Sequence, residues 1–168
     1  MSYQDVRAFL RQNGLADREM LLKDSIDTVE HAVAAIGCRE AGQIMKSLSF
    51  LTDGGPVMIC MAGDARISNP KYKAYFHQKA SMIPFDQVEA LTGHAPGGVC
   101  PFGLKAGVRV YFDVSLRRYD KVYSAGGDDH SAIPFSLDEL DRYVKPVAWI
   151  DVCKDWHEPP TRCWHPGA

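Results

Sequence analysis

Lys46 stands inside an otherwise apolar run, Gly42-Gln43-Ile44-Met45-Lys46-Ser47-Leu48. Burying an ammonium group is costly unless it has a partner, so a lysine in such a strand is a candidate functional residue. Its chemistry would be to neutralise a negative charge. The alternative is a lysine at a strand edge, whose charged end reaches solvent while its stem packs on apolar neighbours.

A second candidate segment is the loop from Thr92 to Gly103, which holds four glycines and two prolines in twelve residues. Such a composition builds neither a strand nor a helix. It builds a rigid loop whose bare backbone can approach a ligand closely. The alternative is a tight connection between two elements, without a role in chemistry.

Several common catalytic motifs are missing from the sequence. It contains no Gly-x-Ser-x-Gly, His-Glu-x-x-His or Gly-x-Gly-x-x-Gly pattern. Lys46 does not belong to a phosphate-binding P-loop, because three residues separate it from Gly42. Four residues near the end, Cys153, His157, Cys163 and His165, have side chains that zinc prefers, but their spacing fits no common zinc module. We therefore expect no metal, and keep a metal-dependent hydrolase as a minor alternative.

Composition and charge narrow the class of protein. The 168 residues are 46% hydrophobic, which suits a single domain over residues 1–168 with a real core. No run approaches the roughly 20 apolar residues of a membrane span, and no signal peptide is visible. The five cysteines include no Cys-x-x-Cys pair, so we expect reduced thiols and a cytoplasmic protein. Residues 66–121 hold nine basic and four acidic side chains, a stretch that could bind phosphates or simply face solvent.

Hydrophobic periodicity and turn residues predict the elements that must position these candidates. Helices are expected over residues 3–13, 27–36, 69–77, 84–91 and 136–144. Strands are expected over residues 43–51, 56–62, 108–114, 121–125, 132–135 and 147–152. The segment Asp53-Gly54-Gly55-Pro56 predicts a hairpin turn between the first two strands, and the second strand, apolar on both faces, is expected to be central. Ser136 is the expected cap of the last helix, with Glu139 in the capping-box position. Because the strands come in adjacent runs, the pattern favours an α+β type of α/β protein: a mixed, largely antiparallel sheet with flanking helices. From about residue 153 we expect an irregular tail.

Five further short motifs accompany the Lys46 segment and the glycine-rich loop along residues 25–145. The order in which all seven follow one another is part of the pattern. The five further motifs are Ser25-x-x-Thr28-Val29-Glu30, Ala62-Gly63-Asp64, Phe112-Asp113-x-Ser115-Leu116, Tyr123-Ser124-Ala125-Gly126-Gly127 and Phe135-Ser136-Leu137-x-Glu139-Leu140. Together the motifs resemble the YbaK/prolyl-tRNA-synthetase-associated domain family. The resemblance implies a curved, partly barrel-like sheet and a hydrolase that frees wrongly attached amino acids from tRNA, often the tRNA for proline.

The resemblance also implies roles for single residues. Lys46, Gly97 and Gly98 would be catalytic, with backbone N–H groups of the loop as donors to the developing oxyanion. Lys46 would neutralise charge on the carbonyl oxygen or on the terminal nucleotide. The residues that would bind the substrate are Val99, Pro101, Ser124 and His130. No cofactor is implied. Cys100 would be a spectator, because nothing in its spacing from His94 fixes an imidazole against the thiol.

The expected partner is the acceptor end of a mischarged tRNA, and prolyl-tRNA synthetase or an elongation factor could be a protein partner. Basic candidates for the tRNA backbone are Lys71, Lys73, Lys79, Arg117 and Arg118. Members specific for cysteine carry a carboxylate near the position of Ala132, which this chain lacks. Alanine or another small non-cognate amino acid is therefore at least as good a candidate. The alternative is a non-catalytic module of the same fold that binds tRNA or another nucleic acid.

Overall fold

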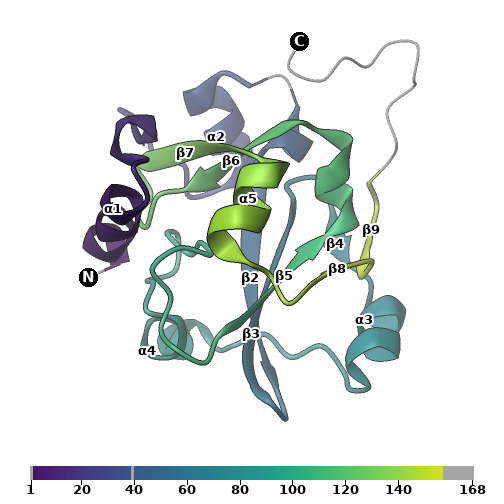
Figure 1. Ribbon diagram of the computed structural model, residues 1–168. Coiled ribbons are helices and arrows are strands. Elements are labelled where there is room, and N and C mark those ends of the chain that lie inside the picture. The colour runs from purple at the N-terminus through teal and green to yellow at the C-terminus, as the bar shows by residue number, and fades with distance from the viewer. Residues whose placement is uncertain (1, 39, 157–168) are drawn as a thin grey trace.

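A long antiparallel hairpin runs through the middle of the molecule (Figure 1). The computed structural model describes residues 2–38 and 40–156. Strands β2 (Met45–Thr52) and β3 (Gly55–Ala62) pair along their whole length, so that Lys46 lies opposite Met61. A two-residue turn joins them at Asp53 and Gly54. The hairpin predicted from the Asp-Gly-Gly-Pro segment is therefore confirmed.

The described residues form three sheets around this hairpin. The first has the order β2-β3-β5-β8, with β5 (Arg109–Asp113) and β8 (Ala148–Ile150). The second is antiparallel with the order β1-β7-β6, formed by β1 (Met20–Leu21), β7 (Ser131–Ser136) and β6 (Lys121–Ala125). A bridge between Ile44 and Tyr123 links the two. The third pairs β4 (Arg66–Ile67) with β9 (Cys153–Lys154). The predicted mixed sheet is confirmed, with β3–β5 and β5–β8 as its parallel pairs.

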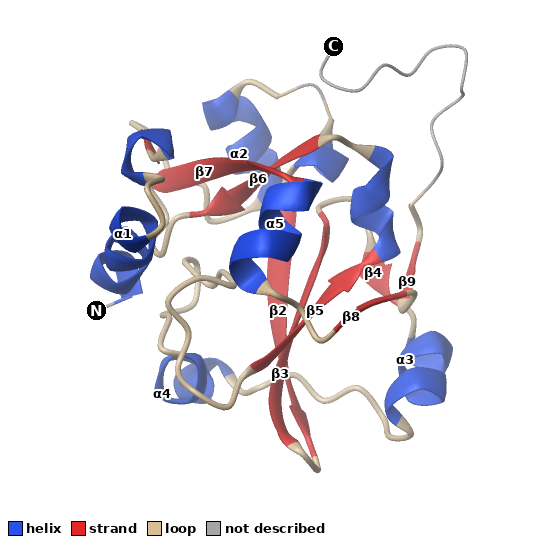
Figure 2. Ribbon diagram, viewed as in Figure 1, coloured by secondary structure: helices blue, strands red, loops and turns tan. Residues whose placement is uncertain are grey.

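In the described part of the chain, five α-helices surround the strands, and Figure 2 shows the first, α1 (Ser2–Gln12), and the third, α3 (Asn69–Phe76), on opposite sides of the hairpin. They are α1 (Ser2–Gln12), α2 (Val29–Ile36), α3 (Asn69–Phe76), α4 (Val88–Thr92) and α5 (Leu137–Val144). Thr28 caps α2, with its hydroxyl accepting from the His31 N–H at 3.1 Å. Ser136 and Glu139 form the predicted capping box of α5. The helix expected over residues 84–91 divides into a 3₁₀ turn, Phe85–Gln87, and α4.

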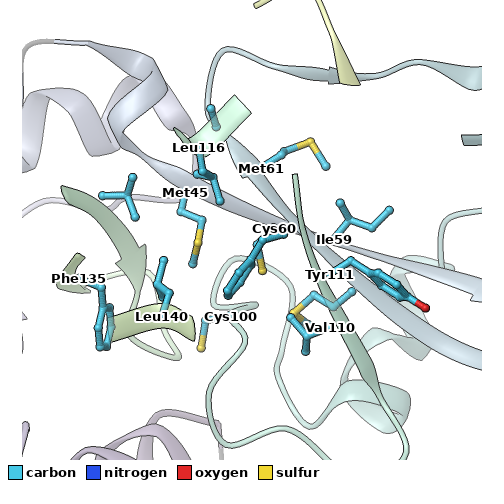
Figure 3. Close-up of a cluster of buried hydrophobic side chains, with 14 of the residues drawn as sticks. Met45, Ile59, Cys60, Met61, Cys100, Val110, Tyr111, Leu116, Phe135 and Leu140 are labelled. Carbon is cyan, nitrogen blue, oxygen red and sulfur yellow. The ribbon is translucent and has the colours of Figure 1, made fainter. Parts of the chain in front are cut away.

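The main core lies on both sides of β3, whose residues from Val57 to Ala62 are all fully buried. Figure 3 shows part of this core, where Met45 and Cys60 of the hairpin meet Cys100 and Leu140. The apolar sequence of β3 predicted such a central strand, and the burial of both its faces confirms it. A smaller cluster of Ile26, Ala32, Ile44 and Ala132 packs beneath α2.

The predicted irregular tail began at about residue 153. The structure places β9 at its first two residues, and residues 157–168 lie outside the described part of the chain. Within the described residues, no helix is both long and apolar enough to cross a membrane.

Candidate functional site

A cavity of about 610 Å³ opens where the start of β2 meets β6. Helix α2, the segment around Met82–Val88 and the glycine-rich loop enclose it. Its wall is mostly apolar. The lining residues are Ile26, Asp27, Thr28, Val29, Ala32, Ile36, Ile44, Met45, Lys46, Ser47, Leu48, Ser49, Met82, Ile83, Phe85, Val88, Pro96, Gly97, Val99, Tyr123, Ser124 and Ala125.

Lys46 is the one lysine or arginine among these lining residues, and Asp27 is the one carboxylate. The Lys46 side chain is half-buried, and its Nζ donates to the Gly63 carbonyl oxygen at 3.4 Å. Burial lowers the pKa of Lys46, and nearby Arg66 acts in the same direction. The carboxylates of Asp64 and Glu30 oppose that shift. The cavity thus holds one cation in a largely apolar surrounding, where charge interactions are strong.

The middle of the glycine-rich loop, around Pro96 and Gly97, faces the cavity. Gly97 has φ +94°, a left-handed conformation that favours glycine, and a Cβ there would meet no atom within 4 Å. Val99 also lines the wall. In the described part of the chain, neither the Gly97 nor the Val99 N–H has a hydrogen-bond acceptor. Both groups are available as donors to a ligand.

Gly98 and Pro101 are placed differently from these two residues. Gly98 is buried against Gly127, whose carbonyl oxygen would lie 2.5 Å from an added Cβ. Its N–H donates to the Ala95 carbonyl oxygen at 3.1 Å, inside the loop's own turn. Pro101 is buried and does not line the cavity. Gly98 therefore packs against Gly127 and does not line the cavity.

Ser124 and His130, both predicted to bind substrate, are also separated. Ser124 lines the cavity, and its hydroxyl donates to the Ala125 carbonyl oxygen at 3.0 Å. His130 is exposed outside the cavity, with its Nδ1 2.8 Å from Asp129 Oδ1. Of the seven residues predicted for the site, the structure brings Lys46, Gly97, Val99 and Ser124 together at one cavity.

Most of the apolar wall was not predicted as part of the site. Helical spacing predicts Val29, Ala32 and Ile36 on one face of the helix expected over residues 27–36, and that periodicity is the available signal for this part of the wall. This face covers the cavity as well as the small core beneath α2. Nothing in the sequence marked Met82 or Phe85, whose exposed side chains lie at the same cavity.

His94 and Cys100 form a second pair of potentially reactive groups. The His94 Nε2 lies 3.7 Å from the Cys100 Sγ and 2.5 Å from the Phe102 carbonyl oxygen. The expectation from spacing, that no imidazole is held against the Cys100 thiol, was therefore wrong, because the loop brings the His94 ring next to it. Both side chains are fully buried and neither lines the cavity. Burial raises the pKa of Cys100 to about 12 and lowers the pKa of His94.

The basic residues proposed to contact the tRNA backbone have different surroundings in the structure. Lys71 contacts Asp151 Oδ1 and the Cys153 carbonyl oxygen, each at 3.0 Å. The guanidinium of Arg117 stacks over Trp149, while Lys73 and Lys79 border a separate hollow. Arg118 corrects the prediction, because its side chain is only 4% exposed and forms an ion pair with Asp64. It is not available to a phosphate.

The described residues contain no group of three histidine, cysteine or acidic side chains suited to a metal ion. Of the four candidates named from the sequence, Cys153 is buried, with its Sγ 3.6 Å from Met61 Sδ. His157, Cys163 and His165 lie outside the described residues.

Comparisons with known proteins point in one direction. A family model described as the aminoacyl-tRNA editing domain matches residues 23–143. The uncharacterized protein YwhH of Bacillus subtilis is 43% identical over 157 residues, covering 93% of this chain and 99% of YwhH. Proline–tRNA ligase of Limosilactobacillus fermentum is 30% identical over 61% of this chain, which corresponds to 19% of that enzyme.

A third relative and a solved structure add to these matches. EbsC of Enterococcus faecalis, named as a candidate Cys-tRNA(Pro)/Cys-tRNA(Cys) deacylase, is 29% identical over 52% of this chain and 55% of its own. The solved structure of a candidate trans-editing enzyme for prolyl tRNA synthetase superposes with a TM-score of 0.81 at 28% identity. It covers 91% of this chain and 97% of that one.

Proposed function

The chain belongs to the aminoacyl-tRNA editing domain family, and we propose that it hydrolyses the ester bond of a mischarged tRNA. The tRNA for proline carrying a small non-cognate amino acid is the proposed substrate, and the chain acts on it in trans. One observation carries the proposal. Lys46 and the unbonded N–H groups of Gly97 and Val99 belong to the wall of a single cavity.

The chemistry needs little more than these groups. An aminoacyl ester is already activated, so a positioned water can attack it without a covalent intermediate. The N–H groups of Gly97 and Val99 stabilise the oxyanion that forms, as donors fixed before the reaction begins. Lys46 neutralises charge on the carbonyl oxygen or on the terminal nucleotide. Ser124 contributes to the pocket that receives the amino acid.

The wall of the cavity supports a small uncharged amino acid. Apolar groups of Val29, Ala32, Ile44 and Leu48 form much of it, and these favour an apolar side chain over a charged one. Ala132, at the position where cysteine-specific members carry a carboxylate, is fully buried. Alanine fits this surrounding, and discrimination between side chains that differ by one methylene is worth about 1–3 kcal/mol.

Support for the tRNA comes from the relatives, two of which are named for proline or its tRNA. The exposed Lys73 and Lys79, together with Lys71 and Arg117, provide weak contacts to phosphates. Prolyl-tRNA synthetase or an elongation factor would then deliver or receive the tRNA in the cytoplasm.

The test is a panel of labelled mischarged tRNAs, each incubated with the protein in the presence and absence of a chelator. We expect turnover of a tRNA for proline carrying alanine or another small amino acid, unaffected by the chelator. Binding should weaken as salt is raised to the physiological range. Salt-sensitive binding without turnover of any member of the panel would indicate the non-catalytic module instead. Turnover abolished by the chelator would indicate a metal-dependent hydrolase.

A further inference from the structure

Arg118 is the most deeply buried cation with a described ion pair. Its Nη1 and Nη2 donate to the two carboxylate oxygens of Asp64 at 2.8 and 2.5 Å, and its Nε donates to the Ser115 carbonyl oxygen at 3.0 Å. Such a buried pair is a weak source of stability, because the loss of hydration offsets much of the charge attraction. A role in fixing geometry is a better explanation of why it is present.

Aromatic rings enclose this ion pair. The guanidinium lies 5.1 Å from the ring centre of Tyr119 and 5.0 Å from that of Trp156. The Tyr119 hydroxyl in turn donates to Glu40 Oε2 at 2.6 Å. We call these five residues, Arg118, Asp64, Tyr119, Trp156 and Glu40, the Arg118 cluster. The guanidinium is thereby held by three hydrogen bonds and two ring contacts, a network that restricts its position.

The Arg118 cluster contacts two segments that determine where the Lys46 ammonium lies. Asp64 directly follows Gly63, whose carbonyl oxygen accepts from Lys46 Nζ at 3.4 Å. Gly42 lies just before β2 and packs so closely that an added Cβ would overlap the Tyr119 hydroxyl. A Cβ on Gly63 would likewise overlap the Ala41 carbonyl oxygen. The acceptor of the lysine and the start of its strand are thus held against the same cluster.

We infer that Arg118 and Asp64 are positioning residues, which hold the Gly63 carbonyl and the start of β2 so that the Lys46 ammonium stays at the cavity wall. Neither residue lines the cavity, so they act through Lys46 and not on the substrate. The inference rests on the proposed function only in that Lys46 takes part in the reaction.

The charged groups around Lys46 also support a positioning role for Asp64. The groups that act on Lys46 are Cys153, Arg66, Asp64 and Glu30. Burial lowers the pKa of Lys46, while Asp64 raises it. Asp64 therefore fixes the acceptor of the ammonium and also favours its charged form.

The first experiment needs no substrate. The side chain of Lys46 is followed by NMR during a pH titration of the wild-type protein, of Asp64→Asn and of Glu139→Gln. Glu139 is the control because it also forms a partly buried ion pair with an arginine, Arg18, but does not act on Lys46. We expect Lys46 to lose its proton at lower pH in Asp64→Asn and at the wild-type pH in Glu139→Gln. An unchanged titration in Asp64→Asn would overturn the inference.

The second experiment measures single-turnover deacylation in two backgrounds. If Asp64 acts through Lys46, Asp64→Asn should slow the wild-type enzyme about tenfold, the scale of one lost charged hydrogen bond. The same change should slow Lys46→Ala by less than about twofold, since coupled residues are not additive. Equal losses in both backgrounds would mean a general structural effect and would overturn the inference. If Asp64→Asn does not fold, Arg118→Lys replaces it in the rate measurements in both backgrounds, because it keeps the charge but loses the two-pronged contact with Asp64.

The two experiments separate this inference from the proposed function. A wild-type protein that deacylates no tRNA would end the proposed function. The NMR titration would still decide whether Asp64 acts on the Lys46 ammonium.

Discussion

Two places in this chain bring potentially reactive side chains together, and the glycine-rich loop contributes to both. In the cavity, Lys46 shares a wall with Gly97 and Val99. In the core, His94 lies 3.7 Å from the Cys100 thiol. By residue type and distance alone, the second pair looks more like a catalytic centre, since an imidazole beside a thiol is the usual way to activate a cysteine.

The two places differ in whether a ligand can reach their side chains. Both His94 and Cys100 are fully buried, and neither lines the cavity that holds Lys46. Burial disfavours both charged forms, raising the pKa of the thiol to about 12 and lowering that of the imidazole. A nucleophilic cysteine needs the opposite shift. The middle of the loop, from Pro96 to Val99, thus faces the cavity, while His94 before it and Cys100 after it are buried in the core.

The largest expected effect comes from Lys46→Ala. Losing this charge should raise the barrier to deacylation by on the order of 2–4 kcal/mol, the scale of one missing oxyanion donor. The matched control is Lys105→Ala, because Lys105 Nζ also donates to a backbone carbonyl, that of Ala90, at 2.7 Å. Single-turnover rates on the preferred mischarged tRNA provide the measurement. A folded Lys46→Ala protein with a near-normal rate would remove Lys46 from the site.

Replacing Gly97 tests whether the cavity-facing middle of the glycine-rich loop takes part in the reaction. Gly97 and Gly107 share φ +94°, and an added Cβ meets nothing within 4 Å at either position. Substitution by alanine should therefore strain the backbone equally, costing about 1–3 kcal/mol of unfolding free energy in each variant. Only Gly97→Ala should also slow deacylation, roughly tenfold to a hundredfold, because small displacements at a reacting centre are costly.

The measurement for this pair combines urea denaturation with the deacylation rate. Similar stability losses with similar rates would contradict the assignment of Gly97 to the site. Slow deacylation by Gly97→Ala, together with a normal rate for Gly107→Ala, would confirm that the middle of the glycine-rich loop contacts the substrate.

Sequence patterns predicted the elements well where local chemistry determines them. The Ser136–Glu139 capping box and the Asp53-Gly54 turn are local signals, and both are found. The apolar run of β3 likewise predicted a strand buried on both faces. What could not be predicted was which strands pair in parallel, since the contacts of β5 with β3 and β8 depend on residues far apart along the chain.

The site shows the same limit at the level of single residues. Gly97 and Gly98 are neighbours of the same type, so sequence treats them alike. One faces the cavity while the other packs on Gly127. Arg118 was predicted as a surface cation from its basic neighbourhood, but its partner Asp64 is 54 residues away. Burial and long-range partners separate such residues, and neither is encoded in spacing.

Cys100→Ser tests the buried part of the glycine-rich loop. Its expected effect on the deacylation rate is smaller than that of Gly97→Ala. We expect deacylation to fall by less than about threefold, because ester hydrolysis by water needs no thiol. Stability should fall by about 1–3 kcal/mol, since a hydroxyl replaces a thiol in the core. In native wild-type protein, iodoacetamide should label the partly exposed Cys38 before the buried Cys100. An acyl-enzyme detected by mass spectrometry would replace the water mechanism by a covalent one.

The smallest expected effect is a pH dependence of stability that originates at His94. Burial lowers the pKa of His94 in the folded protein, although the Phe102 carbonyl oxygen opposes the shift. In the unfolded chain the imidazole should titrate near its ordinary value of about 6.5. Below that pH the unfolded state binds a proton that the folded state does not, so stability should fall as pH decreases from about 6.5 toward the lowered pKa. Between pH 7 and 6 the loss should be under about 1 kcal/mol. Urea denaturation of the wild type and His94→Gln at several pH values measures it, because the glutamine amide is long enough to replace the Nε2 donor to Phe102 but does not titrate. Identical pH dependence in the two proteins would show that the buried imidazole binds protons as readily as an exposed one, and the contrast between the two places would then rest on access alone.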